Sequence, residues 1–207
     1  MAHIPDGVLS VPVLVTGGVL AAAGIGIALR RIDERAIPRA AILSSAFFAL
    51  SLVAIPLGPT SAHLLLGGLM GLILGSAVFL AVFAALLLQA VMFGFGGLTT
   101  LGVNTFNIAM PGALMGLLLA PAIARAGSAK AAALAGFGSG LAVLATGALV
   151  AAALYFSSPD YAASAKVMIA TYLPLAAIEG LVAGSCVSFV KRVKPELLSD
   201  RLVEARS

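Results

Sequence analysis

Nitrogen ligands for a metal ion are the chemistry that this sequence indicates most clearly. The chain has two histidines, His3 and His63, and imidazole is the commonest metal ligand in proteins. If the initiator Met1 is removed, the amine of Ala2, the amide nitrogen of His3 and the His3 imidazole form fused chelate rings. His63 then completes a plane of four nitrogens, which suits Ni(II) or Cu(II). If Met1 stays, residues 1–3 already fill that plane, and His63 is surplus or axial.

Other kinds of chemistry lack the residues that they need. The single cysteine, Cys186, excludes a disulfide framework, a thiolate zinc site and an iron–sulfur cluster. The sequence has no phosphate loop of the type G-x-x-x-x-G-K-[ST], so the chain is not expected to hydrolyse ATP. There is no Ser/His or paired-Asp arrangement either. We therefore expect neither an enzyme nor an organic cofactor.

The composition indicates that the bilayer is the solvent. Apolar residues make up 61% of the 207 residues, charged residues make up 10%, and the mean hydropathy is +1.15. A soluble domain is about half apolar and about a quarter charged. These values exclude a cytosolic enzyme and a disordered chain. They also exclude a nucleic-acid partner, despite the net charge of +4.

We expect an all-α integral membrane protein with seven transmembrane helices, since one span needs about 20 mostly apolar residues. The apolar run 63–93 is too long for one span and can break at Gly75-Ser76. With the N-terminus outside and the C-terminus cytoplasmic, eleven of the twelve Lys and Arg lie inside, as the positive-inside rule favours. A membrane-embedded domain over 1–190 and a short charged cytoplasmic tail over 191–207 follow. The expected helices cover 9–29, 39–55, 61–74, 77–93, 108–124, 131–156 and 167–190.

Polar residues between the apolar runs are candidates for supporting a metal site. The Gly-rich segment 94–112 is expected to form a re-entrant loop over an outer pocket, or else a plain connector. Asn104 and Asn107 lie in it, and they either hold the site together or make turns. Asp6 could hydrogen-bond a ligating imidazole or cap the first helix. Gln89 could reach the same network.

Three separated stretches of the sequence resemble a known family. They read His3-Ile-Pro-Asp-Gly7, Ser61-Ala-His-Leu-Leu-Leu-Gly-Gly68 and Leu101-Gly-Val-Asn-Thr-Phe-Asn107. In this order they resemble the CbiM/NikM family, the metal-specific substrate-binding (S) components of energy-coupling factor (ECF) transporters for nickel and cobalt. The resemblance runs from His3 to about Gly184, which is most of the chain.

The resemblance implies a ligand set and a transported substrate, Ni²⁺ or Co²⁺. The family's ligands fall on Ala2 (amine), His3 (amide and imidazole) and His63. The family usually starts with Met directly followed by His, and removal of Met1 here restores the same chelate. Nickel is favoured by the Ile-Pro-Asp-Gly start and by the planar nitrogen set. The alternatives are a cobalt-specific member that feeds cobalamin synthesis, and a self-contained metal channel or secondary transporter.

The resemblance also implies partners in the inner (cytoplasmic) membrane. These are a transmembrane coupling protein, cytoplasmic ATPase subunits and, in some systems, a small auxiliary membrane protein. Ala41, Ser45 and Ala49 recur every fourth residue, and small residues at that spacing let another helix approach closely. Such a face docks the coupling protein in related S components; the alternative is packing within this chain. Glu179, in the last span, is expected to be structural or coupling-related and far from the outer site.

Overall fold

The computed structural model describes residues 3–34, 36–53, 55–57 and 60–198, and their regular secondary structure is helical apart from one short hairpin. The α-helices are α1 (Val11–Arg31), α2 (Ala36–Ser51), α3 (Gly67–Leu74), α4 (Val78–Phe93), α5 (Leu101–Arg125), α6 (Ser128–Ser157) and α7 (Ala162–Val193). Two 3-10 turns, η1 (Gly75–Ala77) and η2 (Pro159–Tyr161), lead into α4 and α7. Strands β1 (Ile55–Leu57) and β2 (Thr60–Ala62) pair antiparallel between α2 and α3.

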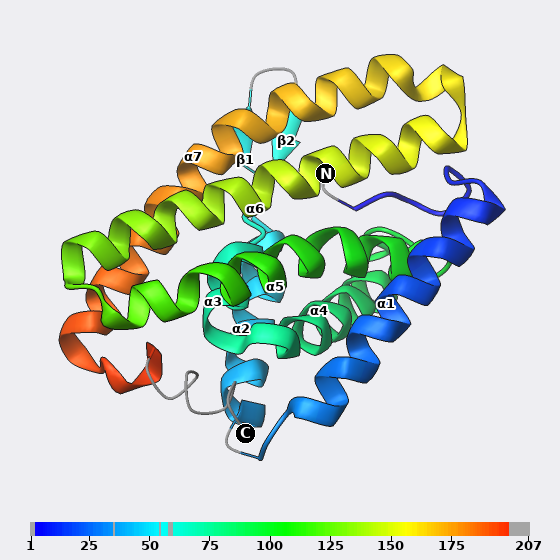
Figure 1. Ribbon diagram of the computed structural model, residues 1–207. Coiled ribbons are helices and arrows are strands. Elements are labelled where there is room, and N and C mark those ends of the chain that lie inside the picture. Colours follow the sequence, from blue (N-terminus) through cyan, green and yellow to red (C-terminus); the bar gives the residue numbers. More distant parts are fainter. Residues whose placement is uncertain (1–2, 35, 54, 58–59, 199–207) are drawn as a thin grey trace.

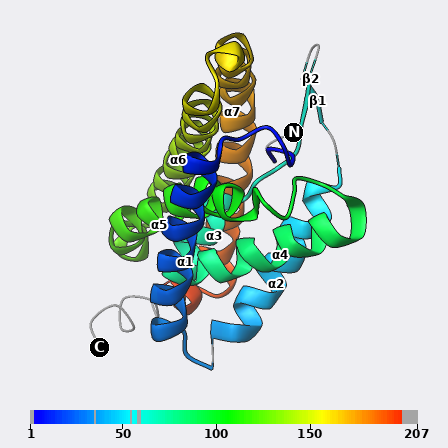
Figure 2. The same ribbon diagram turned by 90° about the vertical axis from the view of Figure 1, so that its right-hand side faces the viewer.

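The longer helices pack around the short helix α3, which contacts α5 and α6 most extensively. The long antiparallel pair α6 and α7 crosses one side of the molecule, and α5 packs between α6 and the group formed by α3 and α4 (Figure 1). Helix α1 packs along α5 at one edge of the molecule. In the second view, the hairpin of β1 and β2 stands beside the segment that precedes α1 (Figure 2). The segments before α1 and after β2 therefore approach each other.

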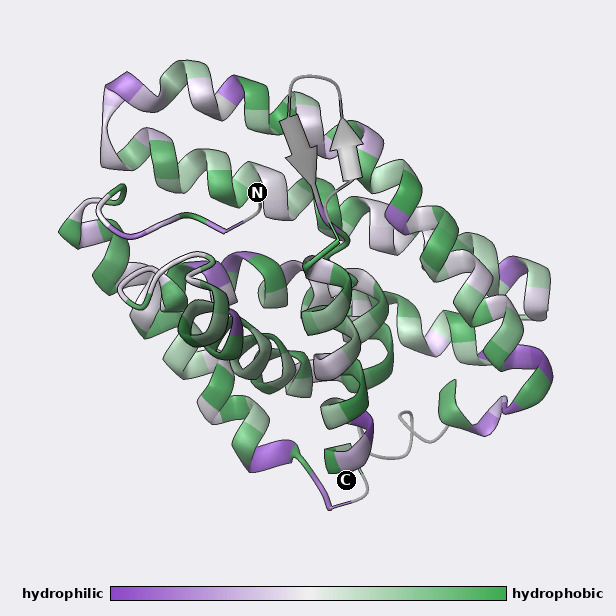
Figure 3. Ribbon diagram, turned by 180° about the vertical axis from the view of Figure 1, so that it is seen from behind, coloured by the Kyte–Doolittle hydropathy of each residue, from purple (hydrophilic) through white to green (hydrophobic). Residues whose placement is uncertain are grey.

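The outer surface suits a lipid environment. Among the described residues, five helical stretches are long and apolar enough to cross a membrane, and they comprise α1, Gly67–Phe93, α5, α6 and Pro159–Val193. Helix α2 is apolar but has only 16 residues. Most of the helical ribbon has the colour of hydrophobic residues, and many of the hydrophilic residues lie near helix ends (Figure 3). Large side chains such as Leu181 and Phe156, each 74% exposed, would face lipid. The protein is a multi-pass membrane protein.

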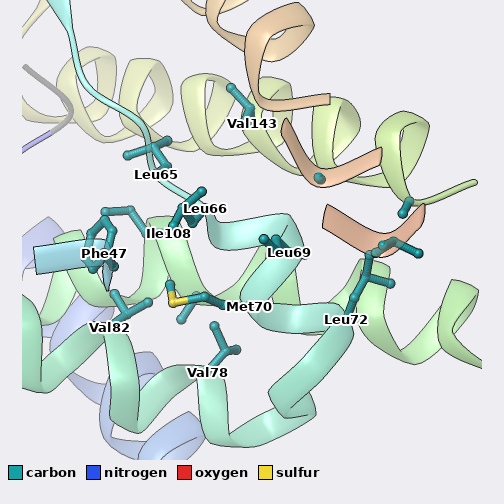
Figure 4. Packing of buried hydrophobic residues seen from close by; sticks show 14 of the residues in the cluster. Phe47, Leu65, Leu66, Leu69, Met70, Leu72, Val78, Val82, Ile108 and Val143 are labelled. Carbon is teal, nitrogen blue, oxygen red and sulfur yellow. The ribbon is translucent and has the colours of Figure 1, made fainter. Parts of the chain in front are cut away.

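The helices agree with the expected segments in number, but the run 63–93 differs. The expected break is confirmed, because the chain turns at η1 (Figure 4). However, the expected helix 61–74 begins only at Gly67, since residues 60–62 form the unforeseen strand β2. Helix α3 has eight residues and is about 12 Å long, too short to cross a bilayer alone. The membrane sidedness and the domain division at residue 190 remain predictions.

The expected loop over 94–112 is wrong for most of its length. Helix α5 already begins at Leu101, so only residues 94–100 are non-helical. The helix-breaking glycines are concentrated at the start of the segment, where Gly94 (φ +64°) ends α4 in the left-handed conformation. Gly102 is compatible with the helix and lets α1 approach, since a Cβ there would lie 2.6 Å from the Cα of Gly18. Asn104 and Asn107 therefore sit on a helix.

The core surrounds α3 and fixes the residues just before it. Gly71 packs against the backbone of Gly112 in α5, where a Cβ atom would lie 1.8 Å from the carbonyl oxygen. Residues from several elements close around α3 (Figure 4), and those with essentially no exposure include Phe47, Leu65, Met70, Val82 and Ile108. The segment between β2 and α3 is thus held inside the protein.

Candidate metal-binding site

The two histidines of the chain meet inside the protein. His3 lies in the segment before α1, and His63 lies between β2 and α3. Their rings are stacked, with centroids 4.8 Å apart and an interplanar angle of 29°. His3 is 6% exposed and His63 is 5% exposed. Two imidazoles from distant parts of the sequence therefore share one buried position.

Each of the two rings has a buried nitrogen atom without a described partner. The Nδ1 of His63 lies 3.1 Å from the carbonyl oxygen of Leu64. Because a carbonyl only accepts, Nδ1 carries the proton and Nε2 keeps its lone pair. Within the described part of the chain, the Nε2 atoms of His3 and His63 are both buried without a hydrogen-bond partner. Buried polar atoms are seldom left unpaired, so these two atoms call for a further partner such as a metal ion.

Burial keeps the imidazoles unprotonated. It lowers the pKa of His3 from 6.5 to about 3, and the neighbouring His63 ring adds to the shift. Burial also lowers the pKa of His63, although the hydrogen bond to Leu64 acts in the opposite direction. Metal ions bind neutral imidazole, so both rings are in the ligating form at neutral pH.

Asn104 in α5 fixes the segment that carries His3. Its Oδ1 accepts from the backbone N–H of Ile4 at 3.0 Å, and its Nδ2 donates to the carbonyl of Ile4 at 3.1 Å. The hydroxyl of Thr100 donates to the same carbonyl at 2.7 Å and accepts from Nδ2 of Asn104 at 3.2 Å. Asn104 in α5 and Thr100, the residue just before α5, therefore satisfy both the backbone N–H and the carbonyl of Ile4. Thr100 was not identified from the sequence.

Asp6 ties the same segment to the loop before α5. Its carboxylate accepts from the N–H groups of Leu98 (3.2 Å), Thr99 (3.0 Å) and Thr100 (3.4 Å), and from the Thr99 hydroxyl. The Thr99 hydroxyl is the largest cause that lowers the pKa of Asp6, so the carboxylate is ionised at neutral pH. The two roles considered for Asp6, a partner for an imidazole and a cap for the first helix, do not match these contacts. Asp6 holds the 98–100 turn.

Glu179 is much closer to the histidines than its position in the last span suggested. This α7 side chain is 1% exposed, and its carboxylate accepts from the backbone N–H groups of Leu65 and Leu66. Those residues follow His63 by two and three positions. The expectation that Glu179 lies far from the site is wrong, because the segment after His63 enters the core and reaches α7. A carboxylate within an apolar run indicated that Glu179 has a special role, but the sequence did not identify its hydrogen-bond partners.

The other candidates fall into separate places. Gln89 is fully buried in α4 and donates to the hydroxyl of Ser51 in α2, so its recorded contact is not with the histidines. Asn107 is buried in α5, and its Nδ2 has no partner among the described residues. Ala2 lies outside the described residues. No group of three His, Cys, Asp or Glu side chains that could hold a metal ion occurs among the described residues, so a site here needs ligands of another kind beside His3 and His63.

The small-residue face of α2 points outward. Ala41, Ser45 and Ala49 are all exposed. The opposite side of α2 makes the contacts within the chain, since Phe47 is buried and the hydroxyl of Ser44 donates to the carbonyl of Ala81 in α4 at 2.7 Å. The fold therefore does not support the alternative in which this small-residue face packs against another part of the chain.

The sequence of this chain is similar to those of known proteins of one family. The family described as "Cobalt uptake substrate-specific transmembrane region" (CbiM) matches residues 3–197. The chain is similar to the cobalt transport protein CbiM of Sorangium cellulosum, with 32% identity over 220 residues, which cover 99% of this chain and 97% of that protein. It is also similar to the fused nickel transport protein NikMN of Rhodobacter capsulatus, with 32% identity over 231 residues, which cover 98% of this chain and 65% of that protein.

A solved structure has the same fold. The crystal structure of a transition metal transporter superimposes with a TM-score of 0.69 at 25% identity, and the match covers 92% of this chain and 93% of that one.

Proposed function

Because this chain belongs to the CbiM family of cobalt and nickel uptake membrane components, we propose that it captures Ni²⁺ or Co²⁺ at His3 and His63. The family consists of transporter membrane components, so the protein is not an enzyme. The metal ion is the transported substrate of the protein.

One observation supports the site above the others: two stacked, buried and neutral imidazoles whose Nε2 atoms have no described partner. A metal ion would satisfy Nε2 of His63. In the fused chelate His3 would bind the ion through Nδ1, because only this ring nitrogen can close a ring with the amide nitrogen of the same residue. The remaining nitrogens are the amide of His3 and the amine of Ala2, once Met1 has been removed. Asn104, through Ile4, and Asp6, through the 98–100 turn, would hold the chelating segment in place. Among the described residues, no Asp or Glu forms a ligand group with the two histidines.

Nickel is the ion that we propose first. Four nitrogens in a plane suit the preference of Ni(II) for square-planar geometry better than that of Co(II). The relatives include proteins named for cobalt transport and for nickel transport. A cobalt-specific member is therefore the alternative within the same family.

Transport itself would need partners. We propose a transmembrane coupling protein and cytoplasmic ATPase subunits, with a small auxiliary membrane protein as a further component. The exposed face of Ala41, Ser45 and Ala49 is the surface proposed for docking the coupling protein, because small residues allow close helix contact. A self-contained channel is less well supported. Glu179 is the only Asp, Glu, Lys or Arg among the buried described residues, and its carboxylate is engaged by backbone N–H groups.

The test is a nickel titration of purified protein that retains its native N-terminus. We expect one tightly bound Ni²⁺ per wild-type chain, measured by equilibrium dialysis and elemental analysis. His63→Ala should bind at least about 100-fold more weakly, since it loses a direct ligand rather than a supporting one. Tyr172→Phe removes a buried hydroxyl that has no described partner and serves as the control. Equal affinity of His63→Ala and wild type, for both Ni²⁺ and Co²⁺, would contradict the proposal.

A further inference from the structure

We propose that Glu179 is a positioning residue for His63, and that it acts through the peptide unit between Leu64 and Leu65. This inference rests on the proposed function, because it concerns how His63 is presented to the ion. Glu179 does not face the ion in this account. It fixes the tautomer and the direction of the ring that does.

One peptide unit connects the carboxylate to the imidazole. The carbonyl of Leu64 accepts from His63 Nδ1 at 3.1 Å, and the N–H of Leu65 donates to Glu179 Oε1. These two backbone groups belong to the same peptide unit. Because a peptide unit is planar and rigid, holding its N–H in one direction also fixes the direction of its carbonyl. Glu179 therefore determines where the acceptor for His63 Nδ1 lies.

A second pair of contacts keeps the peptide from rotating. The N–H of Leu66 lies 2.9 Å from Oε1 and 3.1 Å from Oε2 of Glu179. Leu66 has φ +49°, and it is the only non-glycine residue with positive φ in the described ranges. This conformation is unfavourable for leucine and persists only where the surroundings enforce it. The carboxylate, which receives two successive N–H groups, is the group that enforces it here.

The position of the carboxylate is itself well determined. Glu179 is 1% exposed, and the neighbouring residues Ala176 and Ala183 on the same face of α7 are also buried. Next to it, Gly180 packs backbone against backbone with α6, where an added Cβ would lie 2.9 Å from the carbonyl oxygen of Gly136. Helix α7 is therefore seated firmly at this level, and the peptide after His63 is attached to a fixed point.

The arrangement has an electronic consequence as well as a geometric one. Hydrogen bonds in series polarise one another, most strongly away from water. A carboxylate on the Leu65 N–H makes the Leu64 carbonyl a better acceptor for His63 Nδ1–H. Metal-binding histidines commonly donate Nδ1–H to a carboxylate or a carbonyl, which fixes the tautomer and makes Nε2 a stronger ligand. Here a peptide unit lies between the carboxylate and the imidazole.

The experiment is ¹⁵N NMR of metal-free protein labelled at histidine. With two histidines in the chain, only four ring nitrogens give signals, and His3→Gln assigns them. We expect wild-type His63 to be protonated at Nδ1. Glu179→Leu should give a mixture of tautomers at His63 and weaken nickel binding about 10–100-fold. Glu179→Gln keeps one acceptor oxygen and should lie between wild type and Glu179→Leu in both measurements. Tyr172→Phe, a buried polar change on the same helix, should match wild type.

The outcomes separate this inference from the proposed function. If Glu179→Leu does not fold, the Glu179→Gln variant decides alone. The inference is overturned if the folded Glu179 variants keep the wild-type His63 tautomer, whether or not their nickel affinity falls, since a fall without a tautomer change indicates a general structural role. Failure of wild type to bind Ni²⁺ or Co²⁺ would overturn the proposed function. The metal-free tautomer comparison would still test the link from Glu179 to His63.

Discussion

The carboxamide of Asn104 pairs with both backbone polar groups of Ile4, accepting from its N–H at 3.0 Å and donating to its carbonyl at 3.1 Å. An adjacent β-strand would satisfy these same two groups, so one side chain sets the register of an extended segment. Ile4 directly follows His3. The position of the His3 ring against His63 therefore depends on a residue whose hydrogen bonds go to Ile4, the residue after His3.

Replacing Asn104 should weaken metal binding without unfolding the protein. In Asn104→Ala the buried N–H of Ile4 loses its partner, which costs about 1–3 kcal/mol and releases the His3 segment. We expect nickel affinity to fall about 10–100-fold in equilibrium dialysis. Thr105→Val is the matched control, because Thr105 is buried next to Asn104 and its hydroxyl has no described partner. Wild-type affinity in Asn104→Ala would show that the pairing is irrelevant to the site.

Asp6 should control how fast the ion leaves. The carboxylate holds the His3 segment to the turn 98–100, so we expect Asp6→Ala to release nickel about 3–10-fold faster in stopped-flow chelator competition. Asp6→Asn keeps an acceptor and should have a smaller effect. Asp160→Ala, which changes another exposed carboxylate, is the control. An unchanged release rate in Asp6→Ala would show that the contacts of Asp6 with residues 98–100 do not slow the release of nickel.

The sequence predicted the helical class and the break at Gly75, because these depend on local composition. The metal site at His3 and His63 stays a prediction, and the structure shows that the two rings are in contact. The sequence did not predict the strands at 55–57 and 60–62, or that α5 begins at Leu101. The glycines of 94–112 are concentrated before residue 98, and Gly102 is required by close packing against α1. The sequence also did not predict the position of Glu179 near His63. Its partners are backbone N–H groups more than a hundred residues away, which no residue pattern identifies.

The buried histidines should make the metal-free protein less stable in acid. The pKa of His3 is about 3 in the folded chain and 6.5 when exposed, so the unfolded chain binds more protons between these values. Stability is therefore retained above about pH 6.5 and lost as the pH falls, by about 2 kcal/mol for His3 at pH 5. The lowered pKa of His63 acts in the same direction.

Circular dichroism melts between pH 8 and pH 5 measure this effect. The difference between the wild type and the double variant His3→Gln/His63→Gln isolates the contribution of the histidines. The wild type should lose more thermal stability on acidification than the double variant. Parallel pH dependence of the two proteins would mean that the rings are not buried as neutral groups.

The exposed face of α2 should matter for uptake and not for binding. Ser45→Trp places a bulky side chain on the face formed by Ala41, Ser45 and Ala49, so it should prevent close approach of a partner helix. We expect nickel uptake by cells that contain the partners to fall at least about 10-fold, with unchanged nickel affinity of the purified protein. Leu117→Trp, at a 68% exposed position of α5, is the control. Normal uptake by Ser45→Trp would remove this face from the docking surface.

X-ray absorption spectroscopy of the nickel-loaded protein tests the central claim most directly, since it reports the ligand atoms, the geometry and the number of imidazoles. The account predicts a four-coordinate planar ion with nitrogen ligands only, two of them imidazoles, and one imidazole fewer in His63→Ala. Mass spectrometry of the same sample should show a chain that begins at Ala2. A six-coordinate ion with mainly oxygen ligands, or a spectrum unchanged in His63→Ala, would contradict the account.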